Sequence, residues 1–195
     1  WFAATIRTAS TPSAPAQKPH RPSRWRVLLY AAEIAVVLAV AWDVTAELRV
    51  NAPDMRLYGK EAEYLTASAY SAAYDLHTYG YIALWQPWLE HGEPLITGPF
   101  SFVLNPLSTG PSLLTDGLRG IKLSVVVYTL FAGLGGWFLG RVLGLGTVGR
   151  VLLGLLMAGR GSMHAPISAG FFQLAASQAY MPWIVAGTVA TLRDY

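Results

Sequence analysis

The sequence predicts an all-α integral membrane protein with about four transmembrane helices and one large outer loop that contains surface helices. Hydrophobic residues make up 53% of its 195 residues and charged residues only 13%, about half the charged share of a typical soluble domain. Three apolar stretches approach or exceed the length needed to cross a bilayer core. A polar segment of about 75 residues separates the first stretch from the second. A soluble protein with buried helices fits less well, because three such stretches occur in one short chain.

The N-terminal segment, residues 1–26, is predicted to be a flexible basic tail in the cytoplasm. Its prolines oppose a helix, and its positive charge favours a place beside anionic lipid headgroups. No folded nucleic-acid-binding module accompanies it, so no nucleic-acid partner is expected. Five basic residues and no acidic ones precede the first apolar stretch: Arg7, Lys18, Arg21, Arg24 and Arg26. By the positive-inside rule, this places the N-terminus in the cytoplasm of a multi-pass plasma-membrane protein.

The first transmembrane helix is predicted over residues 27–44. Its length approaches the roughly 20 residues that cross a bilayer core. Glu33 and Asp43 are its two charged residues, and each is expected to reach an interface or to face protein.

The C-terminal part, residues 121–195, is predicted to form a helical bundle of about three further membrane segments. Residues 123–139 and 170–192 are apolar and uncharged. Residues 148–158 form a shorter apolar run that holds Arg150. At 1.5 Å per residue this run is too short to span alone, so it either needs flanking residues or forms a buried half-helix.

Three glycines recur every four residues in and after the second apolar stretch: Gly136, Gly140 and Gly144. This spacing puts them on one helix face, where small residues allow a second membrane helix to approach closely. The second helix is expected to belong to the same chain, and the alternative is another membrane subunit that binds this face.

The large extracytoplasmic loop, residues 45–120, holds most of the acidic residues of the chain. Acidic residues do little to set topology, so their concentration here suggests a function. Residues 60–79 are predicted to form an amphipathic helix, which lies along the membrane surface or against the spans. The helix is rich in Ala, Leu and Glu and carries an apolar stripe at helical spacing: Leu65, Ala69, Ala72 and Leu76.

The residues after this helix are rich in tryptophan and proline. Trp85 and Trp88 suit a membrane interface, because each has an apolar body and an N–H group that can reach water. The alternative is that they stack on a substrate. Glu90, His91 and Glu93 are interpreted as a solvated loop rather than a metal site, since adjacent ligands of this kind are a weak signal. The absence of cysteine excludes a thiolate metal site and a cysteine nucleophile.

A series of short motifs resembles a known family. Residues 84–95, LWQPWLEHGEPL, are similar to a signature of the YfhO-related multispanning bacterial proteins, which belong to the broad GT-C class of membrane glycosyltransferases. Further segments resemble later motifs of that family, in the same order, and the whole series covers about residues 50–192: 99–101, 105–107, 139–145, 169–173 and 180–183.

The resemblance implies that a sugar is transferred from a polyprenyl-phosphate donor on the outer membrane face. It implies that an acidic residue of the first outer loop is the base or orients the acceptor, and Glu61 and Glu63 are the matching residues. It also places Trp85, Gln86 and Trp88 as candidate substrate-binding residues. No cofactor or metal is assigned.

The spacing of Glu61 and Glu63 decides whether the two carboxylates can act together on one substrate. Two residues apart, they point away from each other in a helix and share one face only in an extended segment. A cooperating pair therefore requires an extended chain here. The alternative explanation is that acids in a first helical turn are stabilised by the helix dipole alone.

Two functions of different class follow from these observations. The first is a glycosyltransferase or its N-terminal part, supported by the two glutamates and the Trp/Pro signature. The second is a non-catalytic scaffold or accessory subunit of a larger membrane complex. The second is favoured by the short length and by Phe171, which stands where the family has histidine.

Overall fold

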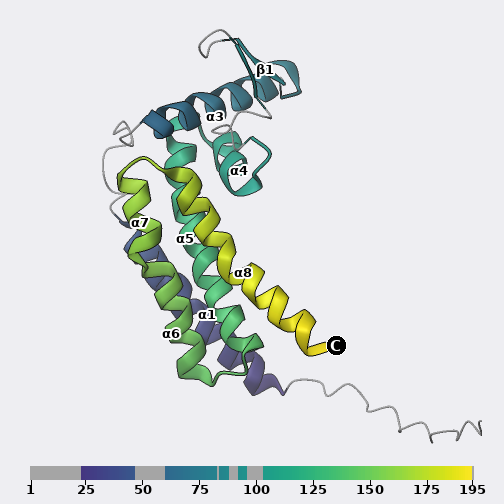
Figure 1. Cartoon of the computed structure of the whole chain (residues 1–195), viewed down its shortest axis with the longest axis vertical. Coiled ribbons are helices and arrows are strands. Elements are labelled where there is room, and N and C mark those ends of the chain that lie inside the picture. Colours follow the sequence, from purple (N-terminus) through teal and green to yellow (C-terminus); the bar gives the residue numbers. More distant parts are fainter. Residues whose placement is uncertain (1–22, 47–59, 83, 88–91, 96–102, 195) are drawn as a thin grey trace, which may run out of the picture.

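The computed structural model describes residues 23–46, 60–82, 84–87, 92–95 and 103–194. Within these residues the chain is helical apart from one antiparallel ribbon of two short strands. Five helices form an elongated bundle: α1 (Arg24–Val44), α5 (Gly117–Val142), α6 (Thr147–Gly159), α7 (Gly161–Ser168) and α8 (Phe172–Asp194). The remaining elements gather at one end of the bundle (Figure 1): α3 (Lys60–Tyr79), β1 (Trp85–Gln86), β2 (Glu93–Pro94) and α4 (Pro106–Leu114). We call this group of elements the platform.

Two of the described helices are long and apolar enough to cross a membrane by length and composition. These are α1, with a mean hydropathy of 2.0, and α5, with 1.7. They confirm the helices expected over residues 27–44 and 123–139, although α5 begins four residues before the expected boundary at 121. The helix α8 has sufficient length at 23 residues but does not reach the same apolar character. The four expected membrane crossings remain predictions.

The short apolar run at 148–158 continues into a second helix. Arg160 ends α6 and begins α7, with an extended backbone at ψ 132°. The two helices stand end to end in Figure 1. Together α6 and α7 rise about 32 Å, whereas α6 alone rises about 20 Å. The helix α6 thus extends the run by one residue at each end, and a crossing made by α6 and α7 together stays a prediction.

The central helix is α5, which contacts α1, α3, α4, α6 and α8. Small residues on it let α6 come close. A Cβ atom added at Gly136 would lie 2.6 Å from the Leu153 carbonyl oxygen, and one at Gly140 would lie 3.0 Å from Arg150 Cα. The glycine face is thus covered by α6 of the same chain, as the intrachain alternative expected, and not by another subunit.

Gly144 has a different role from the one its spacing suggested. It lies beyond the end of α5 with φ 76°, a left-handed conformation that glycine adopts without steric cost. The Leu145 N–H bonds the Gly140 carbonyl, and the Gly144 N–H bonds the Arg141 carbonyl. This is the Schellman pattern that ends a helix. The expectation that Gly144 shares a packing face with Gly136 and Gly140 is therefore wrong.

The platform helix α3 has the bounds that the sequence predicted. Leu65, Ala69 and Ala72 of its apolar stripe are buried. Leu65 and Ala69 join a core cluster with residues of α5, α7 and α8, including Ile121 and Phe172. Of the two positions expected for this helix, the structure therefore has it against the bundle.

A test of the close packing compares two glycine changes. Gly136→Ala should lower the free energy of unfolding by about 1–3 kcal/mol, because the new methyl group meets backbone of α6. Gly187→Ala on α8 is the matched control, since nothing lies within 4 Å of a Cβ there. It should be neutral, or stabilising by up to about 1 kcal/mol through helix propensity. Thermal unfolding of the purified variants measures both, and equal midpoints would contradict the packing.

Candidate functional site

The two glutamates proposed as catalytic residues lie in the first turn of α3. Because α3 begins at Lys60, both are helical, and two residues of helix separate them by about 200°. The extended segment that a cooperating pair requires is absent here, so at most one of the two can face a site, and a catalytic role for either stays a prediction. Glu63 is exposed, and the side chain of Glu61 lies outside the described part of the structure. Their position in the first turn fits stabilisation by the helix dipole.

The tryptophan motif begins in the β-ribbon at the other end of α3. Trp85 pairs with Pro94, and Gln86 pairs with Glu93. The Trp85 ring is half exposed and lies over Gly92, where an added Cβ atom would approach its Cζ2 atom to 2.6 Å. Only the backbone of Gln86 is described, and Trp88 falls outside the described residues.

Glu63 and Trp85 are not brought together. Sixteen residues of helix separate Glu63 from the end of α3, a rise of about 24 Å. The ribbon follows that end, as Figure 1 shows. Candidate base and candidate substrate-binding residue therefore occupy opposite ends of the platform.

A buried polar cluster joins the platform to the bundle and was not predicted. The Asn105 side chain caps α4 by accepting from the Leu107 N–H at 3.1 Å, and it also accepts from the Tyr180 hydroxyl at 3.1 Å. Nearby, the Ser108 and Tyr128 hydroxyls lie 2.5 Å apart. Two segments that resemble the glycosyltransferase family, 105–107 and 180–183, thus meet in space. The sequence signal was an Asn directly before a helix-starting Pro.

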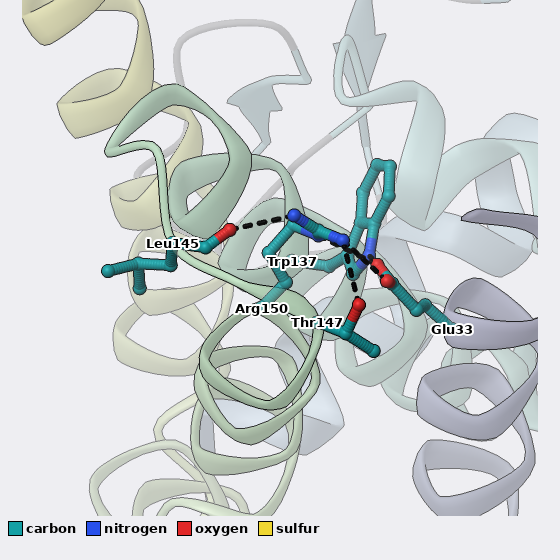
Figure 2. A network of polar contacts seen from close by, with 5 residues as sticks. All are labelled: Glu33, Trp137, Leu145, Thr147 and Arg150. Atoms are coloured by element: carbon teal, nitrogen blue, oxygen red, sulfur yellow. Dashed lines mark hydrogen bonds and ion pairs between the residues drawn. The ribbon is translucent and has the colours of Figure 1, made fainter. Parts of the chain in front are cut away.

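The strongest polar interaction in the described bundle is an ion pair between α1 and α6 (Figure 2). Arg150 donates from Nη2 to Glu33 Oε1 at 2.5 Å and from Nε to Glu33 Oε2 at 2.8 Å. This bidentate geometry is the strong form of an arginine–carboxylate ion pair. The Trp137 indole N–H of α5 donates to the same Glu33 Oε2 at 2.8 Å. Three helices therefore converge on one carboxylate.

The remaining donors of Arg150 are also used. Its Nη1 donates to the Leu145 carbonyl at 2.7 Å, and its Nη2 reaches the Thr147 hydroxyl at 3.2 Å. The guanidinium carbon also lies 5.1 Å from the centroid of the Tyr30 ring, within cation–π range. We call these residues, together with Glu33 and Trp137, the ion-pair network.

The ion-pair network is suited to structure rather than to acid–base chemistry. The Glu33 side chain is only 2% exposed and that of Arg150 only 11%. Both carboxylate oxygens of Glu33 are engaged, which leaves no oxygen free to accept a proton from a substrate. The sequence shows Glu33 and Arg150 each inside an apolar run, but an ion pair between them was not predicted. Opposite charges in two separate apolar segments are the signal that could have done so.

No metal-binding group of three His, Asp or Glu side chains occurs among the residues that the structure describes. Glu90 and His91 of the acidic loop lie outside those residues, and Glu93 is described through its backbone alone. Comparison with protein-family models, with curated proteins and with solved structures finds no match for this chain.

Removing one partner of the ion pair should strongly destabilise the bundle. Glu33→Gln leaves the buried Arg150 charge unpaired, so the free energy of unfolding should fall by about 3–5 kcal/mol. The control Asp43→Asn makes the same chemical change at an exposed position of α1 and should cost less than about 0.5 kcal/mol.

The double variant Glu33→Leu/Arg150→Met distinguishes the cost of losing the ion pair from the cost of leaving one buried charge without a partner. It removes both charges, so it should recover most of the stability that Glu33→Gln loses. Thermal unfolding in one lipid or detergent system compares all four proteins. A Glu33→Gln midpoint equal to that of Asp43→Asn would show that the ion pair does not hold the helices.

Proposed function

We propose that this chain is a multi-pass plasma-membrane protein that forms the platform-bearing part of a GT-C-like glycosyltransferase. In this proposal four crossings, made by α1, α5, α6–α7 and α8, carry the platform on the outer membrane face. There the full enzyme transfers a sugar from a polyprenyl-phosphate donor. The observation that carries the proposal is the placement of α3 across one end of the bundle, with Glu63 exposed in its first turn.

The membrane assignment is supported by what each long helix exposes. Only 17% of the apolar window of α1 is buried within the protein, against 67% for α5. A soluble protein would leave the apolar side chains of α1 in water, whereas a bilayer would cover them. Glu33 of α1 and Arg150 of α6 pair with each other, as is typical of charges at membrane depth.

The orientation is supported by basic residues at the end opposite the platform. Arg24 and Arg26 lie at the start of α1, and Arg141 lies in the last turn of α5. Arg193 in the last turn of α8 donates to the Val142 carbonyl, which joins the C-terminal end of α8 to the C-terminal end of α5. A basic end of this kind is expected in the cytoplasm, which places the platform outside.

The chemistry assigned to Glu63 is general-base catalysis. A carboxylate within about 3 Å of the acceptor hydroxyl accepts its proton as the new glycosidic bond forms. Glu33 is already occupied by Arg150 and Trp137, whereas Glu63 is exposed in the first turn of α3. We therefore assign the base to Glu63 alone.

A non-catalytic accessory subunit is the second candidate. Two observations favour it: the two glutamates do not form a pair, and the buried carboxylate of Glu33 serves the bundle. In that role the platform would bind partner subunits without chemistry. The transfer assay below separates the two candidates.

Topology can be tested with single cysteines, because the natural chain has none. Thr78→Cys at the exposed end of α3 should react with an impermeant thiol reagent in intact cells. Ser23→Cys, next to the start of α1, should react only after the membrane is permeabilised. The reverse pattern would overturn the orientation, and reaction at both sites in intact cells would overturn the membrane crossing.

Activity can be tested by following transfer of labelled sugar from a polyprenyl-phosphate donor in the full-length protein. Glu63→Gln should lower the rate by about 10²–10⁴-fold through loss of the base, with the thermal midpoint unchanged. Glu61→Gln, on another side of α3, and Glu93→Gln, in the distant strand β2, should retain activity. Full activity in the Glu61→Gln/Glu63→Gln double variant would remove both residues from the mechanism and favour the accessory role.

A further inference from the structure

A row of four exposed tyrosine rings runs along α3 and past its C-terminal end: Tyr70, Tyr74, Tyr79 and Tyr81. Each ring contacts the next. The centroids of Tyr70 and Tyr74 lie 6.4 Å apart with nearly parallel planes, those of Tyr74 and Tyr79 lie 6.3 Å apart, and those of Tyr79 and Tyr81 lie 6.1 Å apart. We call these four residues the tyrosine row. Contiguous exposed aromatic surface of this kind typically marks a binding site.

The row does not serve the core of the protein. On another side of α3, Leu65 and Ala69 pack against the bundle, and Ala72 packs with Leu95 and Val103. Glu63, Tyr70 and Tyr74 follow one another at seven and four residues, a spacing that puts them on a single helix face. A carboxylate and two aromatic rings thus share one exposed side of α3, whose Tyr70 Cβ atom lies beside Gly117 at the start of α5.

The charge of this surface restricts what can bind it. Over residues 63–79 of α3 the charged side chains are Glu63 and Asp75; Lys60 begins the helix, and the nearby Arg119 of α5 is paired with Asp116. A phosphate-bearing ligand or an anionic lipid surface would meet carboxylates rather than cations. The row also lies on the platform, at the end of the bundle that the proposed topology puts outside the membrane. The surface therefore fits a neutral, water-soluble ligand.

We propose that the tyrosine row binds a neutral oligosaccharide. The negative face of each aromatic ring attracts the partly positive C–H groups on the apolar face of a sugar ring. Several rings in succession match several sugar units rather than one. The Glu63 carboxylate, at one end of the row, accepts a hydrogen bond from a sugar hydroxyl. The inference rests on the proposed function for the identity of this sugar, which would be the acceptor whose hydroxyl Glu63 deprotonates.

The test measures binding rather than turnover. The protein is placed in phosphatidylcholine nanodiscs, which avoid detergents with sugar headgroups, and is titrated calorimetrically with maltohexaose, cellohexaose and chitohexaose. At least one of them should bind at concentrations below about 10 mM. Tyr74→Ala should weaken that binding about tenfold, whereas Tyr74→Phe keeps the ring and should change it less than about threefold. The control Phe171→Ala removes an exposed aromatic ring outside the row and should have no effect.

The outcomes are distinct from those of the transfer assay. The inference is overturned if none of the three sugars binds, or if Tyr74→Ala binds as tightly as the natural chain. It is also overturned if Tyr74→Phe loses as much binding as Tyr74→Ala, since the hydroxyl rather than the ring would then make the contact. Sugar binding without transfer would preserve the tyrosine row and refute the glycosyltransferase, and transfer without binding would do the reverse.

Discussion

The arrangement of the bundle depends on how one carboxylate is satisfied. Glu33 is buried between α1, α5 and α6, and it receives hydrogen bonds from Arg150 and Trp137. An unpaired charge at this depth would cost several kcal/mol, so the three helices are favoured only in the register that brings these groups together. Apolar packing alone is less selective, since one apolar side chain can replace another at similar cost. The ion-pair network therefore supplies specificity, and the glycines of α5 supply the close approach.

The same central helix connects this network to the platform. Toward its N-terminal end, α5 carries Ile121, Val125 and Tyr128, which belong to the core cluster beneath α3. Toward its C-terminal end it carries Trp137, which reaches Glu33. The polar cluster of Asn105, Ser108, Tyr128 and Tyr180 fixes α4 to α5 and α8 at the platform end. The position of α3 is thus set by the bundle rather than by the membrane surface.

Sequence reasoning predicted the helices well and the pairing of side chains poorly. The bounds of α3 follow from its composition and flanking glycines, and α1 and α5 follow from apolar length. The partner of Glu33 could not be predicted, because periodicity places a residue on a face but does not say which helix covers that face. Whether Glu61 and Glu63 could form a pair depended on local structure that the sequence left open. The condition for a pair was an extended chain at residues 61–63, and α3 begins one residue earlier. The tyrosine row was not predicted, because spacing along a helix does not show which aromatic rings contact one another across different faces.

In the proposed topology one crossing is divided into α6 and α7, and this division has a consequence for how the protein enters a membrane during synthesis. Of these two helices, α6 would reach the translocon first. It has 13 residues and carries Arg150, so it is too short and too charged to enter the bilayer efficiently by itself. The tight turn at Gly144 holds this helix beside α5, so the two would enter as one hairpin. Glu33 is synthesised more than a hundred residues earlier, so it would already be present in α1 when Arg150 needs a partner. The order of synthesis therefore matches the order in which the charges are needed.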